Sequence, residues 1–188
     1  MAMRTQHRSP TPPQPAVTIR SLAAADLDAV VAIDAAAQGR TRRAYIERRL
    51  RAAQRDGALH VQFAALAGDE RAASAGGGLL GFMLGRLLEG EFGRRQRVLR
   101  LELLGVRAER RGAGIGRQLF EAVSQWARRR GCSEVLTSAD WRDDALLAWF
   151  AATGFALAPH RIVECAVEGA VSGAIEGAIE GAIAGTVE

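Results

Sequence analysis

The sequence predicts an α/β protein of the mixed α+β kind: one mixed, largely antiparallel sheet with helices on both faces. Three observations support this fold class. Some segments alternate in polarity as strands do, and others carry apolar residues three or four apart as helices do. Their order is strand, two helices, three strands, helix, strand, helix, strand. Consecutive strands favour hairpins and a strand–helix–strand unit favours a parallel crossover, so we expect both kinds of pairing in one sheet.

The first part of the chain predicts one strand and two helices. Val17–Arg20 is a short run rich in β-branched residues, which is typical of a strand. Apolar residues at roughly helical spacing predict a helix over 26–38. A strongly basic segment over 41–55 predicts a second helix, which ends near Gly57.

The middle of the chain predicts three strands, over 60–67, 79–88 and 97–106. A turn rich in glycine and charge, residues 68–78, separates the first two strands. Residues 89–93 join the last two, and this short connection indicates a hairpin.

After residue 106 the apolar spacing changes to that of a helix. Ile115, Leu119, Val123 and Trp126 lie three or four residues apart and predict a helix over 115–130, closed by Gly131 at its C-cap. The remaining predicted elements are a strand over 133–138, a helix over 143–153 that stops at Gly154, and a strand over 156–167.

Both ends of the chain differ from the predicted domain, residues 17–167. Residues 1–16 contain four of the five prolines and predict a disordered arm rich in Pro and Arg. Residues 168–188 repeat the unit Gly-Ala-Ile-Glu. This tail is interpreted as a flexible acidic segment, with a weak amphipathic helix or a segment docked on another subunit as the alternatives.

Composition excludes several classes of protein. The 188 residues suit one domain, and all 25 basic residues are arginine, so a lysine Schiff base and a P-loop are both excluded. The net charge of +4 favours an anionic partner. Cys132 and Cys165 stand apart, without metal-ligand spacing, and predict neither a metal site nor a disulfide framework but a reducing, cytoplasmic setting. Apolar stretches are too short for a membrane span, and the first fifteen residues lack a signal sequence.

The loop before the predicted helix 115–130 carries the clearest chemical signal. Glycines at 112, 114 and 116 let a ligand approach the backbone, and a helix N-terminus offers unpaired N–H groups with a partial positive charge. The loop therefore predicts a cradle for phosphate or pyrophosphate. It is not a Rossmann loop, because Arg117 occupies the position of that pattern's last glycine.

Two motifs carry a resemblance to a known family. Arg111-Gly112-Ala113-Gly114-Ile115-Gly116 fits the pattern [Arg/Gln]-x-x-Gly-x-[Gly/Ala], and residues 143–155 are similar to Asn-x-x-Ala-x-x-x-Tyr-x-x-x-Gly-Phe. With the strand before the loop and the helix after it, residues 17–167 resemble the GNAT superfamily of N-acetyltransferases. The resemblance implies acetyl-CoA as co-substrate, no metal, and direct acetyl transfer to a primary amine of a small molecule, a protein N-terminus or a lysine. The alternative is a non-catalytic acyl-CoA-binding module of the same fold.

The resemblance also implies which residues contact the co-substrate. The pyrophosphate is expected on the backbone amides of the loop, with Arg117 near the phosphates, and the pantetheine arm beside the end of the preceding strand. The backbone N–H of Leu104 is implied as the donor to the thioester oxygen. The residues implied to bind acetyl-CoA are Leu104, Gly105, Val106, Arg111, Gly112, Ala113, Gly114, Ile115, Gly116, Arg117, Asp143 and Phe150.

Two positions depart from the family pattern. Asp143 replaces Asn, and its carboxylate is a poor neighbour for phosphate, so we expect it to cap its helix or to meet the pantetheine amides. Phe150 replaces the Tyr that is proposed to protonate the departing thiolate. Another group or water then supplies the proton, or the thiolate leaves unprotonated. A core position for Phe150 is the alternative, and both roles can hold together.

Alternation along the strand before the loop singles out Glu102. The strand is expected to place Leu99, Leu101 and Leu103 on an apolar face against a helix, and Glu102 on the other face. A carboxylate in mid-strand is costly unless it is paired or used, and some family members place Glu at this offset as a base. Glu102 is therefore expected to act as general base or to orient the amine. An ion pair with Arg100 or Arg86 is the alternative, and both can hold.

Other partners receive weaker support. Tyr45, the one tyrosine of the chain, either packs or reaches the acceptor site. Arginine clusters raise the question of nucleic acid, but aromatic residues are only 5% and no DNA-reading motif occurs, so nucleic acid is disfavoured as a partner. Exposed strand edges and the repetitive tail favour a homodimer.

Overall fold

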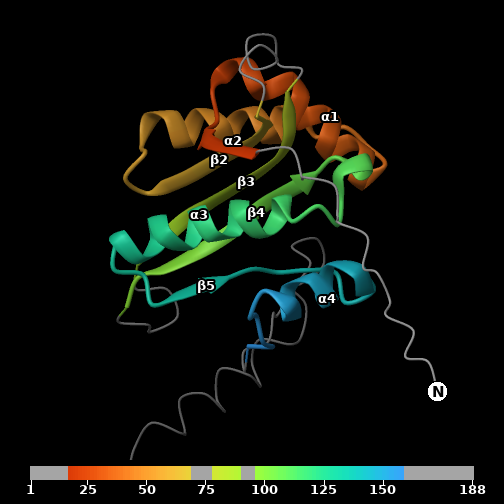
Figure 1. Cartoon of the computed structure of the whole chain (residues 1–188). Coiled ribbons are helices and arrows are strands. Elements are labelled where there is room, and N and C mark those ends of the chain that lie inside the picture. The colour runs from red at the N-terminus through yellow and green to blue at the C-terminus, as the bar shows by residue number, and fades with distance from the viewer. Residues whose placement is uncertain (1–16, 69–77, 90–95, 159–188) are drawn as a thin grey trace, which may run out of the picture. The chain divides into compact units, whose positions relative to one another are not determined.

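A computed structural model describes residues 17–68, 78–89 and 96–158 (Figure 1). These residues divide into two units, one up to Asp143 and one from Asp144, which are described separately. The first unit contains β1 (Val17–Ser21), α1 (Leu27–Gln38), α2 (Arg43–Arg55), β2 (His60–Ala67), β3 (Leu79–Leu88), β4 (Val98–Val106), α3 (Ile115–Arg129) and β5 (Glu134–Leu136). Each was predicted from the sequence: the bounds of β2 and β3 are as predicted, and those of the others differ by at most two residues at either end.

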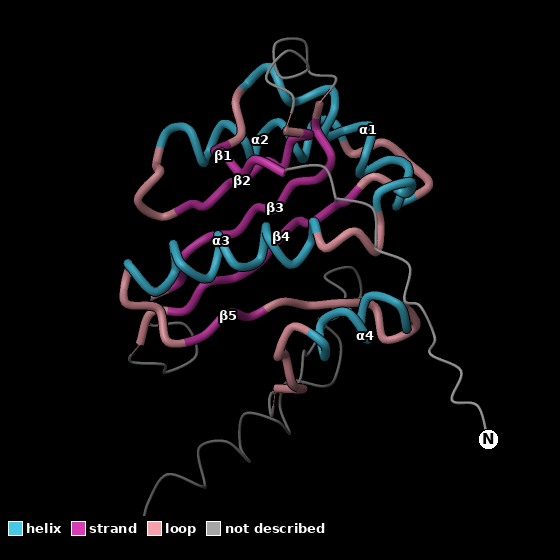
Figure 2. Tube along the Cα trace, viewed as in Figure 1, coloured by secondary structure: helices cyan, strands magenta, loops and turns pink. Residues whose placement is uncertain are grey.

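The strands form one sheet in the order β1-β2-β3-β4-β5 (Figure 2). The first three pairs are antiparallel, and β4 pairs with β5 in parallel. The pairing of β3 with β4 is the predicted hairpin, and α3 provides the crossover to the parallel strand. The predicted mixed, largely antiparallel sheet is therefore confirmed.

Two glycines show that helices cover both faces of this sheet. Successive residues of a strand point to opposite faces. A Cβ at Gly81 would lie 3.3 Å from Ile115 at the start of α3, so Gly81 faces that helix. A Cβ at Gly105 would lie 2.9 Å from Ile33 of α1 and 2.7 Å from Phe82, the residue that follows Gly81 in β3. α3 therefore packs on one face, and α1 packs on the other (Figure 1).

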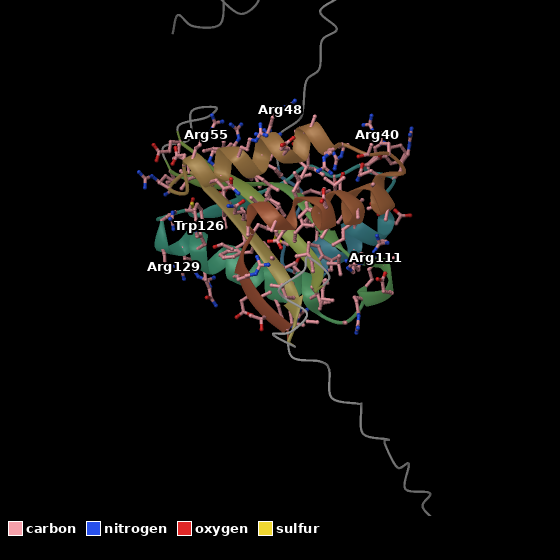
Figure 3. The ribbon with its side chains drawn as sticks, turned by 90° about the horizontal axis from the view of Figure 1, so that it is seen from above. Arg40, Arg48, Arg55, Arg111, Trp126 and Arg129 are labelled. Carbon is pink, nitrogen blue, oxygen red and sulfur yellow. The ribbon has the colours of Figure 1, made fainter. Side chains whose placement is uncertain are left out.

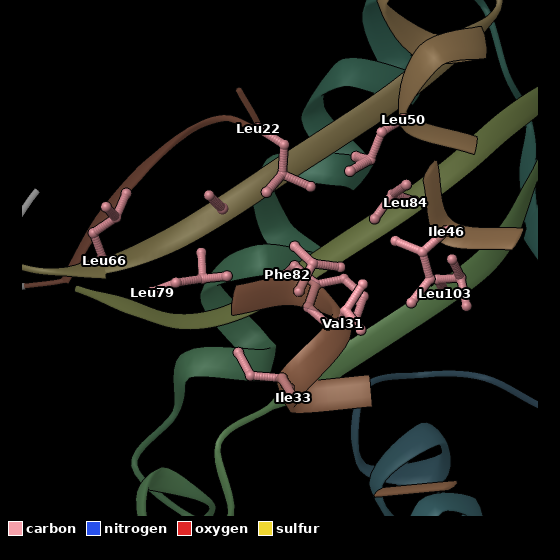
Figure 4. Packing of buried hydrophobic residues seen from close by; sticks show 12 residues of the cluster. Leu22, Val31, Ile33, Ile46, Leu50, Leu66, Leu79, Phe82, Leu84 and Leu103 are labelled. Carbon is pink, nitrogen blue, oxygen red and sulfur yellow. The ribbon is translucent and has the colours of Figure 1, made fainter. Parts of the chain in front are cut away.

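A hydrophobic core lies between the α1–α2 pair and strands β2 to β4 (Figure 4). Full burial of each large apolar side chain contributes about 1.5–3 kcal/mol. This core therefore fixes α1 over β3 and β4, and α2 over β2. Its members are Leu22, Val30, Val31, Ile33, Ile46, Leu50, Ala64, Leu66, Leu79, Phe82, Leu84 and Leu103.

Strand β4 contains a bulge that the sequence did not reveal. Leu84 of β3 lies opposite Leu103, but Gly85 lies opposite Leu101, so Glu102 is an extra residue in β4. A bulge changes which face the following side chains point to. Leu103 accordingly joins the core under α1 and α2, whereas Leu101 shares the face of its partner Gly85. The prediction that Leu99, Leu101 and Leu103 share one face is therefore wrong.

Two other predictions concern strand length. β5 covers only Glu134–Leu136, because these are the residues that pair with Val98–Arg100 of β4. The predicted strand over 156–167 does not begin where expected: residues 156–158 form no strand, and residues 159–167 lie outside the described residues. The predicted arm, residues 1–16, and tail, residues 168–188, also lie outside the described residues.

Two buried carboxylates hold the ends of α1. Asp26 accepts hydrogen bonds from both terminal nitrogens of Arg20, at 2.6 and 2.9 Å, and from the Ala23 N–H at 2.8 Å. Asp34 accepts from Nε of Arg42 at 3.0 Å. Burial alone would raise the pKa of Asp26, but the bonds from Arg20 and Ala23 outweigh it and hold that pKa below its usual value.

The second unit contains α4 (Asp144–Ala152). The Thr153 hydroxyl donates to the carbonyls of Trp149 and Phe150 at 3.0 and 2.9 Å, and Gly154 follows with φ of 95°. The predicted helix stop at Gly154 is therefore confirmed. Among the helices of the described residues, none combines the length and hydropathy that crossing a bilayer requires.

Candidate active site

The loop between β4 and α3 is anchored to β3. Arg107 donates its backbone N–H to the carbonyl of Leu80 at 2.9 Å and its Nε to the carbonyl of Leu79. A 3-10 turn over Ala108–Arg110 then leads to Gly112 and Gly114, with φ of 78° and 77°. Residues other than glycine are strained at these φ angles, so this path of the loop requires glycine at both positions.

The loop presents a group of unpaired amides. In an α-helix the first N–H groups have no acceptor within the helix, and α3 begins at Ile115, so this applies to residues 115–117. Among the described residues, the amides of Gly112 and Gly114 also donate to no backbone carbonyl. An ideal Cβ at either glycine meets nothing within 4 Å, so the space beside them is open. The amides and the helix dipole together favour an anion here.

Two arginines flank this amide group. Arg111 projects from the loop (Figure 3), and Arg117 lies in the first turn of α3. Both are exposed, and neither forms an ion pair within the part of the chain that the structure describes. The structure thus brings the predicted residues 111–117 together in one turn with the charge that a pyrophosphate would need.

Strand β4 has an open edge directly before this loop. β5 pairs with β4 only at Val98–Arg100, and the Thr137 hydroxyl then donates to the carbonyl of Leu101 at 3.2 Å. Beyond that point, no strand of the described residues pairs with this edge of β4. The backbone N–H of Arg107 points to β3, and backbone groups alternate along a strand, so those of Leu104 and Val106 point to the open edge.

A cavity of about 220 Å³ lies at the bulge, on the side of β4 that faces α2. Residues far apart in the sequence meet there, from helix α2, strands β3 and β4, and the segment after β5. Its lining residues are Tyr45, Arg49, Arg86, Arg100, Leu101, Glu102 and Ser138.

Glu102 lies in this cavity between two arginines. Its carboxylate is 3.3 Å from Nη2 of Arg49 and 3.2 Å from Nε of Arg86, and its side chain is 8% exposed. The ion pair with Arg86 was one of the predicted alternatives for Glu102. The other predicted ion pair, between Glu102 and Arg100, is not formed in the described structure. Glu102 pairs with Arg49 instead. Arg100 is exposed and forms no ion pair among the described residues.

Tyr45 contributes to the cavity by holding arginines. Its ring lies 5.2 Å from the guanidinium carbon of Arg49 and 5.6 Å from that of Arg42, both within range of a cation–π interaction. Burial lowers the pKa of Arg49, but the interaction with Tyr45 and the charge of Glu102 outweigh it, so that pKa lies above its usual value. Arg49 therefore stays charged beside Glu102.

The two residues that depart from the family pattern lie at and beyond the boundary between the units. Asp143 directly precedes α4, and its N–H donates to the carbonyl of Asp140 at 3.0 Å. Phe150 of α4 packs edge-on against Trp149 and Phe155, with ring centroids 5.2 and 4.8 Å apart. These contacts support the core position for Phe150, and its place beside the thioester stays a prediction.

Sequence reasoning missed Arg49 and Ser138. Arg49 follows Tyr45 by four residues on a predicted helix, so both lie on one helix face, and that spacing was a signal. Ser138 gave no signal, because it comes from the segment after β5. Among the described residues, no three His, Cys, Asp or Glu side chains are grouped so that they could hold a metal ion.

Comparison with known families identifies the class of protein. Residues 30–155, more than half of the chain, match the Acetyltransferase (GNAT) family. The chain therefore belongs to the GNAT family of acetyltransferases, whose members use acetyl-CoA. No curated protein matches the sequence.

Solved structures with the same fold act on different amines. The aminoglycoside N-acetyltransferase AAC(6')-Iy, solved with CoA, is 18% identical, with a TM-score of 0.68 over 84% of this chain and 99% of its own. A ribosomal-protein-alanine N-acetyltransferase from Brucella melitensis is 20% identical, with 0.60 over 80% and 99%. The glucosamine-6-phosphate N-acetyltransferase from Arabidopsis thaliana is 14% identical, with 0.59 over 80% and 98%. At these identities the likeness shows the fold alone.

Proposed function

We propose that this protein transfers the acetyl group of acetyl-CoA directly to a primary amine, on a small molecule, a protein N-terminus or a lysine. The observation that carries the proposal is one continuous stretch, residues 104–117. Its first part is an open strand edge and its last part is a cluster of unpaired amides at a helix N-terminus. An extended chain of amides that ends in a pyrophosphate fits such a stretch. The open strand edge offers backbone groups that can pair with the amides, and the helix N-terminus offers N–H groups that can bind the pyrophosphate.

The loop and the strand edge hold acetyl-CoA in this proposal. The amides of residues 112–117 bind the pyrophosphate, with Arg111 and Arg117 adding charge. The open-edge groups of Leu104 and Val106 pair with the amides of the pantetheine arm, and the Leu104 N–H donates to the thioester oxygen. Acetyl-CoA supplies the activated acetyl group, so the chain itself needs no covalent nucleophile.

Glu102 orients the attacking amine in this proposal. Its carboxylate is held in place by two guanidiniums. It is therefore positioned to accept a hydrogen bond from the amine, and the proton of the amine passes to water. No side chain is assigned as general acid, because Phe150 has no proton to give and a thiol with pKa of about 8.5 is a tolerable leaving group.

A binding module without turnover is the second candidate, favoured by Phe150 in place of Tyr. The two candidates share the loop and differ in chemistry. Both predict tight acetyl-CoA binding, and only the enzyme predicts release of CoA thiol when an amine is added.

The first test is thermal unfolding with acetyl-CoA and with adenosine. A ligand at 100 times its Kd stabilises by about 2.7 kcal/mol. For a chain of this length that raises the Tm by roughly 5–10 °C, and adenosine should raise it little. Absence of a shift at millimolar acetyl-CoA contradicts both candidates.

A matched pair of variants locates the binding site. Gly114→Ala and Gly39→Ala place a methyl group at nearly the same φ, 77° and 67°, in open space. Both should cost similar stability through backbone strain. Only Gly114→Ala should also weaken acetyl-CoA binding, because it disturbs the amide group at the start of α3. Equal acetyl-CoA affinity in the two variants would place the co-substrate elsewhere.

A further inference from the structure

The cavity at the β4 bulge carries a net positive charge. Three guanidiniums line it, from Arg49, Arg86 and Arg100, against the single carboxylate of Glu102. Glu102 is shared by Arg49 and Arg86, which leaves Arg100 as the cation without an ion-pair partner in the described part of the chain. The residues that line the cavity thus place three positive charges and one negative charge around a space of about 220 Å³.

Two of these arginines lie opposite each other in the sheet. Arg86 of β3 and Arg100 of β4 are direct cross-strand partners. Like charges at opposed positions of a sheet destabilise it. An anion between them would relieve this repulsion, and a planar guanidinium binds carboxylate or phosphate through two parallel hydrogen bonds.

Other lining residues suit the same ligand. The hydroxyl of Ser138 can donate to an anion without adding charge. Tyr45 holds Arg49 through its ring, and Glu102 holds Arg49 and Arg86 through its carboxylate, so two of the three cations are fixed before a ligand arrives. Positioning in advance reduces the entropy that binding costs.

The cavity adjoins the place where the amine must arrive. Glu102 lines it, and the open-edge N–H of Leu104 is two residues further along β4. We propose that the acceptor is an amine that also carries an acidic group, a carboxylate or a phosphate, and that Arg100 binds this group while Glu102 faces the amine. This inference rests on the proposed function. It also implies that polycationic amines are poor substrates, because three guanidiniums and only one carboxylate line the cavity that they would enter.

Matched acids and amides test the charge requirement. The acceptors are glycine, 4-aminobutyrate and 6-aminohexanoate, each compared with its amide, and phosphoethanolamine compared with ethanolamine. Release of CoA thiol gives kcat/KM for each. The acid should exceed its neutral partner by about tenfold or more at the best chain length, as one charge-assisted hydrogen bond provides. The best member of the series then separates a carboxylate from a phosphate.

Variants with equal loss of charge locate the binding group. Arg100→Gln should bring the ratio of acid to amide close to one. Arg48→Gln removes the same charge from exposed α2 surface outside the cavity (Figure 3) and should leave the ratio unchanged. Arg100→Gln should leave acetyl-CoA affinity as it is, since the loop 111–117 is intact.

The outcomes separate this inference from the proposed function. If acetyl-CoA binds, and if the amides or a polycation such as spermidine are acetylated as well as the acids, the acidic acceptor is overturned. The proposed acetyltransferase function is not affected by that result. If no amine is acetylated, calorimetric titration with 4-aminobutyrate and phosphoethanolamine decides. Heat that is lost in Arg100→Gln supports the site, and no heat at 10 mM of either probe overturns it.

Discussion

Replacement of Gly105 by alanine tests how closely β4 packs under α1. An ideal Cβ at this position would lie 2.7 and 3.0 Å from two ring carbons of Phe82, and 2.9 Å from the Cγ2 methyl of Ile33. Carbon atoms in contact normally lie about 3.5–4.0 Å apart. Phe82 is fully buried and Ile33 is 5% exposed, so neither side chain can move into solvent.

The expected cost follows from that geometry. Extra methyl groups in a packed core typically destabilise by about 1–3 kcal/mol. Because two buried neighbours must both shift by more than half an ångström, we expect Gly105→Ala to cost about 2–3 kcal/mol. For a chain of this length the Tm should fall by roughly 5–10 °C.

Urea unfolding, followed by circular dichroism, measures the free energy of unfolding. Phe82→Leu removes the ring that the new methyl group would meet, so Gly105→Ala should cost less in a Phe82→Leu background than in the wild type. A coupling of about 1 kcal/mol or more in this double-mutant cycle is expected. Gly105→Ala within 0.5 kcal/mol of the wild type, or an additive cycle, would refute the packing argument.

Three further predictions concern single side chains. Glu102→Gln should lower kcat and leave acetyl-CoA affinity unchanged. If the kcat of the variant still rises with pH, Glu102 is an orienting group, and if that rise is flattened, Glu102 is a general base. An unchanged kcat would remove Glu102 from the reaction. Asp26→Asn should cost about 1–3 kcal/mol at pH 7 in urea unfolding, because the bonds from Arg20 are charge-assisted. The pKa of Asp26 is lowered in the folded state, so this contribution is present above pH 4 and is lost as the pH falls through the folded pKa. The difference in free energy of unfolding between Asp26→Asn and the wild type should therefore shrink at pH 3. A difference that stays constant with pH would contradict this linkage. Burial raises the pKa of the Cys132 thiol, against the charges of Arg97 and Arg130, so its alkylation, followed by peptide mass spectrometry, should be slower at pH 7.5 than that of a free cysteine; equal rates would contradict this.

Local patterns predicted most of the fold. Helices α1 to α3 and strands β1 to β4 depend on periodicity and on glycine positions that the sequence displays directly. The bulge at Glu102 depends on the register with β3, which no local pattern in β4 contains. The length of β5 likewise depends on how many residues of β4 it meets. What could not be predicted is set by pairing between distant segments.

The candidate site divides along the same line. The loop 111–117 was found because its glycines, its arginines and its helix follow one another in the sequence. The cavity at the bulge is assembled from four segments, and its cation Arg100 was noted only as a partner for Glu102. The structure gives Arg100 a different place: opposite Arg86, without that ion pair.

The open edge of β4 has a consequence for the protein on its own. Unpaired backbone groups at a strand edge can pair with another chain and so begin self-association. From Leu104 to Val106 the described structure offers such an edge, next to the more polar stretch at Arg100 and Glu102. Acetyl-CoA lying along this edge would occupy the same hydrogen-bonding groups. In that case the bound ligand also prevents association through this edge. Preparations that retain CoA should stay monodisperse at concentrations where the ligand-free protein associates.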